Sequence, residues 1–336
     1  MASALESAGQ KMTTWRSDLY ILPAKTKTPD ILLYAGLGGE TTWNRAPVAP
    51  GSHACIAPVY GRKKRTVNRV GGFTKDVKVI QDSGAFSDSW DTRLTVLEAL
   101  KRQDAHAKRF QYESNITHRA TYDLLIDEVW DNGNRFKRRW TVADAESAVE
   151  TTVAAAHFLH ENRDGLPLIV SAQGVDAPQY LRCAQRLMRY MRDEDYFGFG
   201  GWCVIGKMPA VMMPVFRETV ATVVPFLAKE GVKHIHIWGV IYPKALGVLL
   251  FEASQYGITL STDSVGPTTH PIFGQWGYGK PCEGGWRDND YRKPLLENLG
   301  QERARHTSET RAWLDNFKQT PYFRSYPLLL KQRTLF

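Results

Sequence analysis

Short apolar runs alternate with amphipathic stretches along residues 165–263. The short runs predict buried strands at 166–171, 202–205, 234–238 and 258–262. In the stretches between them, apolar residues recur every three or four positions. This spacing predicts helices that begin at Asp176, cover 214–230 up to Gly231, and cover 243–256. Such alternation is typical of a parallel sheet covered by helices.

The amino-terminal half shows the same alternation less regularly. It predicts strands at 31–34, 77–80 and 122–126, and a helix at 143–160 with Thr141 and Asp144 at its cap. Residues 308–317 are also helical in pattern. We therefore expect an α/β fold, a (β/α)8 TIM-type barrel with loop insertions, as a single domain over residues 1–336. Its predicted appendages are a loop near the site at 266–291, rich in Gly, Pro and Trp, and a C-terminal helical segment at 300–336.

Polar residues follow several of the predicted strands. They are Asp82 to Gly84, Asp127 with Glu128, Gln173 with Gly174, Gly200 with Gly201, and Asp263. Because the carboxyl ends of barrel strands converge on one mouth, where catalysis occurs in this fold, we expect these residues to share one site.

Two carboxylates facing one pocket can divide the work of glycosyl chemistry. One attacks the sugar carbon, and the other moves a proton on the departing group. Asp263 and Asp82 are the candidates. Taken singly, each position also has a structural interpretation, because Asp82 is a common turn residue, Asp127 fits a solvated loop and Trp238 fits a core.

The motifs resemble those of the tRNA-guanine transglycosylase superfamily. Residues 82–86 are similar to the family's Asp-Ser-Gly-Gly-aromatic motif, with Ala85 as a departure, and residues 262–268 to its Phe-Asp-Cys-Val-Leu-Pro-Thr motif. Weaker matches follow in the family's order at 127–128, 169–174, 200–206 and 236–240. The resemblance implies that Asp263 is the nucleophile and Asp82 the proton-transfer partner.

The resemblance also implies a site for a guanine-like base. Phe86 and Trp238 would stack on its two faces, and Asp127 would accept its N1 and amino protons. Gln173 would serve its O6 edge together with the backbone of Gly201, which adjoins Gly200. A covalent glycosyl-enzyme would then exchange one base for another with no cofactor.

Charge suggests the polymer that carries this base. The chain has 43 Lys and Arg against 35 Asp and Glu, a net charge of +8. Two basic runs fit contacts to backbone phosphate. They are Arg62, Lys63, Lys64, Arg65 and Arg69, and then Lys137, Arg138 and Arg139. Solvated loops would have the same composition.

The family's tRNA enzymes carry a zinc site made by three cysteines and a histidine after the nucleophile, whereas this chain has Cys282, His270 and His306 there. We expect no bound metal. The short chain and the missing site are typical of the DpdA-type relatives of phages and bacteria, which insert 7-deazaguanines such as preQ0 into DNA. For the pair His234 and His236 we expect buried hydrogen bonds rather than a metal site.

DNA is therefore the expected partner, with tRNA as the alternative. A non-catalytic nucleic-acid-binding barrel, or a glycosidase that uses the same carboxylates on water, also remains open. The four cysteines show neither disulfide nor zinc spacing, and the N-terminus has no apolar signal core. These features favour a cytoplasmic protein, in the host cytoplasm if a phage encodes it. The oligomeric state is not predicted.

Neutralising Arg62, Lys63, Lys64 and Arg65 together should weaken DNA binding at all sequences alike. Each lost phosphate contact should reduce the slope of log affinity against log salt by about 0.9 on duplex DNA. Filter binding or fluorescence anisotropy across a salt series measures this slope. An unchanged slope would remove this run from the DNA interface.

Overall fold

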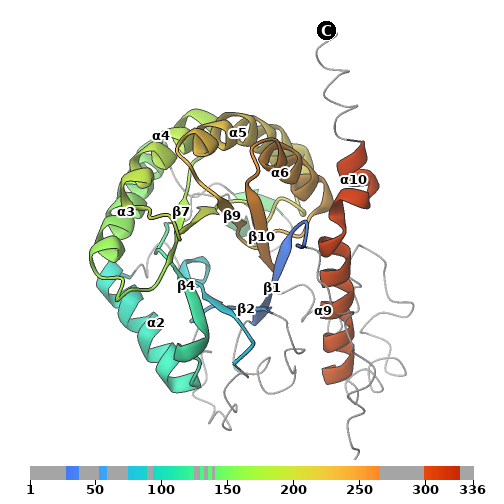
Figure 1. Cartoon of the computed structure of the whole chain (residues 1–336). Helices are drawn as coiled ribbons and strands as arrows, with labels where there is room; N and C mark the ends of the chain where they lie inside the picture. The colour runs from blue at the N-terminus through green and yellow to red at the C-terminus, as the bar shows by residue number, and fades with distance from the viewer. Residues whose placement is uncertain are drawn as a thin grey trace, which may run out of the picture.

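The computed structural model is a closed barrel of parallel strands in the order β1-β10-β9-β8-β7-β4-β3-β2 (Figure 1). It describes residues 28–37, 53–58, 75–88, 94–124, 129–131, 135–137, 141–264 and 299–325. The barrel strands are β1 Leu32–Leu37, β2 His53–Ile56, β3 Val79–Gln81, β4 Ile116–Ala120, β7 Leu168–Ala172, β8 Tyr196–Phe199, β9 His234–Ile237 and β10 Thr259–Ser264. The predicted TIM-type fold is therefore confirmed.

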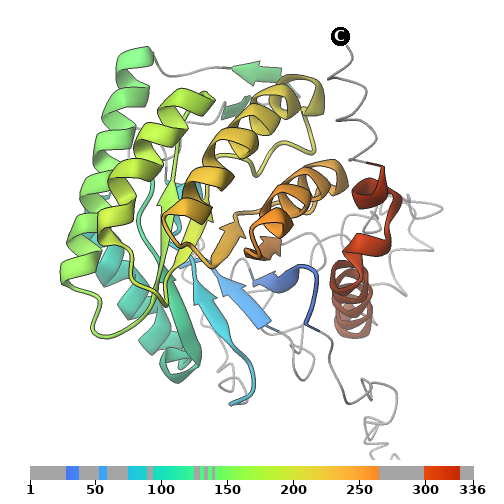
Figure 2. The same ribbon diagram turned by 45° about the horizontal axis from the view of Figure 1, so that its top comes forward.

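Helices surround the strands as an outer ring (Figures 1 and 2). They are α2 Val96–Phe110, α3 Val142–Glu161, α4 Ala177–Leu187, α5 Pro209–Lys229, α6 Pro243–Gln255, α9 Leu299–Asp315 and α10 Pro321–Arg324. Single 3-10 turns are η2 Ala85–Ser87, η3 Glu113–Asn115, η4 Met188–Tyr190 and η5 Phe317–Gln319. A separate hairpin pairs β5 Val129–Asp131 with β6 Arg135–Lys137.

The helix caps explain where two of the predicted helices begin. Thr141 and Asp144 form a reciprocal capping box at the start of α3, in which each side chain accepts the other residue's backbone N–H. At α4, Asp176 Oδ1 accepts the N–H of Gln179 at 2.8 Å, and Pro178 occupies the first turn, where its missing N–H costs nothing.

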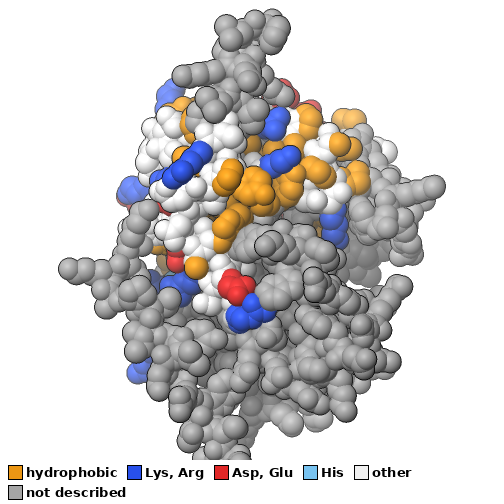
Figure 3. Space-filling model, turned by 90° about the vertical axis from the view of Figure 1, so that its right-hand side faces the viewer, with side chains coloured by type: hydrophobic (Ala, Val, Ile, Leu, Met, Phe, Trp, Pro, Cys, Tyr) orange, Lys and Arg blue, Asp and Glu red, His pale blue; other side chains and the backbone are white. Residues whose placement is uncertain are grey.

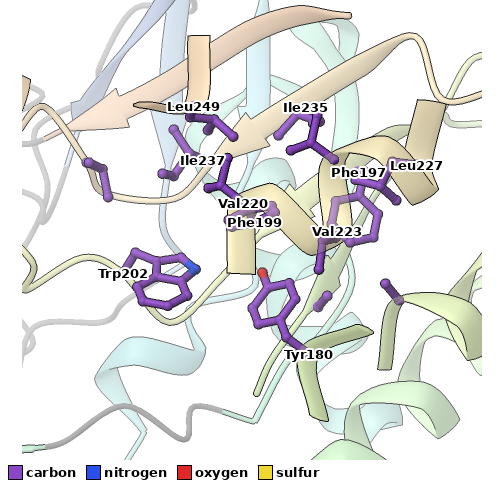
Figure 4. Close-up of a cluster of buried hydrophobic side chains, with 14 of the residues drawn as sticks. Tyr180, Phe197, Phe199, Trp202, Val220, Val223, Leu227, Ile235, Ile237 and Leu249 are labelled. Carbon is purple, nitrogen blue, oxygen red and sulfur yellow. The ribbon is translucent and has the colours of Figure 1, made fainter. Parts of the chain in front are cut away.

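The largest core lies between strands β7 to β10 and the helices outside them, where Tyr180, Phe197, Phe199 and Trp202 gather (Figure 4). Residues 202–205, which the sequence analysis predicts as a strand, form a turn after β8 instead. They are apolar because Trp202 and Ile205 are buried in this core, so hydrophobicity there reflects packing and not strand pairing.

The fourth barrel strand was also wrongly predicted, because it lies at Ile116–Ala120 and not at 122–126. Its sequence is polar, although the side chains of His118 and Arg119 are buried. The Arg119 guanidinium donates to Gln81 Oε1 at 3.0 Å and to Asp104 Oδ1 at 2.6 Å. These partners lower the free-energy cost of burying the charge. Because they allow polar residues in a buried strand, the hydrophobicity pattern does not predict the strand. Strand β2 and helix α2 were not predicted from the sequence either.

Helix α5 is apolar and long enough to cross a membrane by length and composition, with a mean hydropathy of 1.4. Its side chains Phe216, Val220 and Leu227 are fully or almost fully buried in the main core. This packing against the barrel accounts for the apolar composition of α5.

The C-terminal helices lie against the barrel beside β1 and α6 (Figure 2). Ile31 N–H donates to Leu314 O at 3.2 Å, and Lys318 N–H donates to Asp30 Oδ2 at 2.8 Å. A Cβ at Gly247 of α6 would lie 2.7 Å from Tyr322 O, so α10 approaches at a position without a side chain. Hydrophobic side chains form a band on this face of the molecule (Figure 3). The predicted loop at 266–291 lies outside the described residues.

A buried ion pair joins the connections that precede β7 and β8. Arg163 Nη1 donates to both oxygens of Asp195, at 2.8 and 2.9 Å, and their side chains are 3% and 0% exposed. Asp195 also accepts the backbone N–H groups of Leu168 and Arg192 at 2.7 and 2.8 Å. The carboxylate thus fixes the start of one strand relative to the loop before the next.

Asp195→Ala should lower the free energy of unfolding by about 3–5 kcal/mol, because it leaves the Arg163 guanidinium buried without its carboxylate partner. Urea unfolding followed by circular dichroism measures the loss. The matched control is Glu150→Ala, which breaks an exposed pair with Arg186 and should cost less than about 1 kcal/mol. Equal effects of the two substitutions would contradict a structural role for the buried pair.

Candidate active site

Asp263 lies on β10, beside Tyr34 of β1, at the carboxyl end of the barrel. Its Oδ1 accepts the backbone N–H of Gly239 at 2.7 Å and lies 3.3 Å from His236 Nε2. Gly239 has φ 68°, and a Cβ there would lie 2.9 Å from the Cβ of Cys203, so the residue that donates to Asp263 needs to be glycine. One carboxylate oxygen is thereby held while the side chain stays 14% exposed.

Asp82 follows β3, and its backbone N–H extends the sheet by donating to Ile56 O at 2.9 Å. The chain then turns through Gly84, which has φ 76° and donates its N–H to Asp82 Oδ1 at 3.3 Å. A Cβ on Gly84 would lie 2.8 Å from the Arg102 guanidinium, which itself donates to Ser83 O. The Asp-Ser-Gly sequence is therefore explained by conformation, because the turn that needs this glycine places the Asp82 carboxylate at the barrel mouth.

Asp82 and Asp263, far apart in sequence, are electrostatically coupled. Burial, followed by the negative charges of Asp263 and Asp123, raises the pKa of Asp82 to about 7. The Cys55 thiol on β2 donates to Asp263, and burial and the two nearby carboxylates raise the pKa of the thiol well above its usual value. The sequence prediction that these two aspartates meet at one mouth agrees with this arrangement.

Asp123 is a third carboxylate in the same site, and the sequence analysis missed it. It is 7% exposed, accepts from Gln173 Nε2 at 2.5 Å and accepts from Ser83 Oγ at 3.3 Å. Because β4 ends at Ala120, Asp123 is the acidic residue that follows the strand, whereas predicted Asp127 lies outside the described residues. Shifting the strand prediction to Ile116–Ala120 would have identified Asp123.

Gln173 is fully buried at the end of β7. Its Nε2 is occupied by Asp123, and its Oε1 has no hydrogen-bond partner among the described residues. A Cβ on Gly200 would overlap Gln173 Nε2, and one on Gly201, which has φ 84°, would lie 3.0 Å from Oε1. The two glycines thus leave room for the amide, and the buried oxygen can accept a donor from a ligand.

The two predicted stacking residues have different surroundings. Phe86 is on η2 and is 64% exposed. Trp238 is partly buried after β9, where its Nε1 donates to Ser171 Oγ at 2.9 Å and its ring meets His236 edge-on at 4.3 Å. An aromatic ring that is exposed is available to a ligand, whereas Trp238 also packs on the barrel interior.

The predicted phosphate contacts lie mostly outside the described residues, including Arg62 to Arg69, Arg138 and Arg139. Lys137 is on β6, within the connection from β4 to α3. Connections from a barrel strand to the following helix lie at the mouth, so the topology brings Lys137 to the same end as Asp263.

Among the described residues, no group of three or more His, Cys, Asp or Glu side chains is arranged to hold a metal ion. Of the possible zinc ligands, Cys282 and His270 lie outside the described residues, and the side chain of His306 is not described either. The absence of zinc stays a prediction. Both His234 and His236 make hydrogen bonds to Ser261 Oγ, and the contact of His236 is the buried one.

No family model matches the chain, and no curated protein matches it. Among solved structures, it is similar to an L-ribulose 3-epimerase, with 11% identity and a TM-score of 0.37 over 86% of this chain and 100% of the other. It is also similar to a D-psicose 3-epimerase from Clostridium cellulolyticum H10, in a structure with D-tagatose, with 12% identity and a TM-score of 0.37 over 84% of this chain and 99% of the other. Similarity at this level carries no argument about function.

Asp82→Asn should make the protein more stable at neutral pH. Folded Asp82 keeps its proton up to about pH 7, whereas an unfolded aspartate loses it near pH 4, so wild-type stability falls as the pH rises through this window. The variant lacks this loss and should exceed wild type by about 1–3 kcal/mol at pH 8 and by little near pH 4.

Urea unfolding at several pH values measures this difference, with Asp193→Asn as the matched control because the Asp193 side chain is 96% exposed. A difference between Asp82→Asn and wild type that stays constant from pH 4 to pH 8 would show that Asp82 ionises normally.

Proposed function

We propose that this protein is an enzyme that replaces guanine in DNA by a 7-deazaguanine such as preQ0, through a covalent intermediate on Asp263. The observation that carries the proposal is that Asp82 and Asp263 interact at one mouth of the barrel, where burial and then the charges of Asp263 and Asp123 raise the pKa of Asp82 to about 7. One carboxyl can then hold a proton at neutral pH while its neighbour attacks, which is the division of roles that glycosyl transfer needs. The order of motifs shared with guanine transglycosylases supports the same reaction.

In the first half-reaction, an Asp263 carboxylate oxygen forms a bond to the sugar C1′ and the bond from C1′ to guanine N9 breaks. Protonated Asp82 gives its proton to the departing guanine. In the second half-reaction, the incoming base loses its N9 proton to Asp82 and forms a bond to C1′ as the bond to Asp263 breaks. Both carboxyls return to their starting state, so no cofactor is consumed.

The donor edge of the base fits Asp123, the third carboxyl group of the site. Asp123, held by Gln173 and Ser83, would accept the N1 and amino protons of guanine, the role that the sequence analysis gave to Asp127. Gln173 Oε1 would accept a further amino proton, which satisfies an oxygen that has no partner in the described part of the chain. The backbone N–H of Gly201 would serve O6.

Exposed Phe86 would stack on the base, with Trp238 on its other face. The basic runs would hold the DNA backbone, with Lys137 at the mouth end of the barrel.

A paired guanine has to leave its stack before Asp263 reaches the sugar. Single-stranded or mismatched sites should therefore react faster than paired ones.

Asp263→Asn should abolish base exchange and covalent trapping, because an amide cannot attack the sugar carbon. The assay measures release of labelled guanine from DNA and from tRNA side by side, and denaturing gels detect the protein–DNA adduct. The matched control is Asp193→Asn, which changes the same residue type at an exposed position and should keep wild-type activity.

Release from tRNA and not from DNA would replace the DNA proposal by its tRNA alternative. Free sugar in place of exchanged base would indicate hydrolysis. Wild-type exchange by Asp263→Asn would refute the nucleophile assignment altogether.

A further inference from the structure

A series of polar contacts runs through the barrel interior from Asp263, near the carboxyl end of β10, to Thr259 at its amino-terminal end. His236 Nε2 lies 3.3 Å from Asp263 Oδ1, and His236 Nδ1 lies 2.8 Å from Ser261 Oγ. Ser261 Oγ is 2.6 Å from His234 Nε2, and His234 Nδ1 is 2.6 Å from Thr259 Oγ1. All five residues are on the neighbouring strands β9 and β10.

The sequence places these side chains because residues two apart on a strand point to the same face. Positions 234 and 236 of β9 and positions 259, 261 and 263 of β10 therefore alternate across the pair of strands. His236 and Ser261 are fully buried, whereas Thr259 is exposed at the start of β10. Their polar atoms are satisfied by one another inside the barrel.

The carboxylate end fixes the direction of the contacts, because a carboxylate oxygen only accepts and the contact with Asp263 Oδ1 therefore requires a proton on His236 Nε2. Burial, then the nearby His236 and His118, lowers the pKa of His234 to about 3, so its ring is neutral and carries one N–H. The Thr259 hydroxyl lies 2.6 Å from His234 Nδ1 and 3.1 Å from Lys233 O, which also accepts the Thr259 N–H.

When the His236 ring carries one proton, on Nε2, its Nδ1 accepts the Ser261 hydroxyl proton, and Ser261 Oγ accepts from the Nε2–H of the neutral His234 ring. His234 Nδ1 is then an acceptor, and the Thr259 hydroxyl is its partner. The opposite direction would point a lone pair of His236 at the carboxylate, which repels it.

We propose that His236 is a positioning residue that donates its Nε2–H to Asp263 Oδ1, in a tautomer fixed by Ser261 and His234. This inference rests on the proposed base exchange. With Oδ1 held by His236 and by Gly239 N–H, the other oxygen, Oδ2, attacks the sugar. The ring itself is held edge-on against Trp238 and Tyr34, at 4.3 and 5.9 Å between centroids.

The two half-reactions use this donor differently. While the sugar ester exists, the carboxyl of Asp263 carries no charge, and a negative charge returns to it as the bond to C1′ breaks. A donor aimed at Oδ1 stabilises that charge, so it speeds the second half-reaction. In the first half-reaction the same donor stabilises the attacking carboxylate before it reacts, and it gives no comparable acceleration.

A pulse-chase experiment separates the two steps. The full-length protein is mixed with single-stranded DNA, the covalent adduct is quantified on denaturing gels, and excess preQ0 is then added to discharge it. In His236→Leu, discharge should be about 100-fold slower while adduct formation changes much less, so the adduct accumulates. His236→Gln keeps an N–H near the position of Nε2 and should restore most of the discharge rate.

The control His157→Leu removes an exposed histidine of α3 that stacks on Tyr190, and it should leave both rates unchanged. Equal slowing of formation and discharge in His236→Leu, or an unchanged discharge rate, would overturn the inference. If wild type forms no adduct at all, the proposed function fails instead.

A second measurement needs no activity. Histidine ¹⁵N chemical shifts in the labelled protein report which ring nitrogen carries the proton. We expect the Nε2–H form for His236 in wild type and a shift toward Nδ1–H in Ser261→Ala, in which the hydroxyl that donates to Nδ1 is removed. An Nδ1–H form of His236 in wild type would overturn the inference even if His236→Leu fails to fold.

Discussion

Repulsion between carboxylates at the barrel mouth is the constraint around which the rest of the site is arranged. Asp82, Asp123 and Asp263 come from three strands or the residues just after them, and in these largely buried surroundings their charges cannot all be carried at low cost. The surrounding residues interact differently with each of the three carboxyl groups, which lowers this cost. Asp263 receives a backbone N–H at 2.7 Å, Asp123 receives the Gln173 amide, and Asp82 retains a proton up to about pH 7.

The glycines follow from the same constraint. Gly84 turns the chain so that its N–H reaches Asp82, and Gly239 turns so that its N–H reaches Asp263, both with positive φ. Gly200 instead leaves space for Gln173, which orients Asp123. A side chain at any of these positions would disturb a carboxylate without touching it directly.

The sequence predicted the parts of this architecture in which one type of force dominates. Helices α3 and α4 have capping residues and regular apolar spacing, and their beginnings were predicted closely. Strand β4 escaped prediction because its Arg119 is buried by pairing with Gln81 and Asp104, which come from elsewhere in the chain. Long-range pairing of this kind has no local signature.

Within the site, the motif positions 82 and 263 were predicted because each aspartate follows or ends an apolar run. Asp123 was missed for the same reason that β4 was. The contacts of His236 with Ser261 and Asp263 depend on the register of β9 against β10, which the sequence does not show.

The series of polar contacts from Asp263 to Thr259 has a consequence for the evolution of residues at the amino-terminal rim of the barrel. In barrel enzymes, residues at the amino-terminal ends of strands are usually expected to maintain stability and to vary without effect on the reaction. Here the exposed hydroxyl of Thr259 is the last member of a series of contacts that begins at the proposed nucleophile, Asp263. Selection for activity should therefore act on positions 259 and 261, and a family of such proteins would show covariation between them and the histidines of β9.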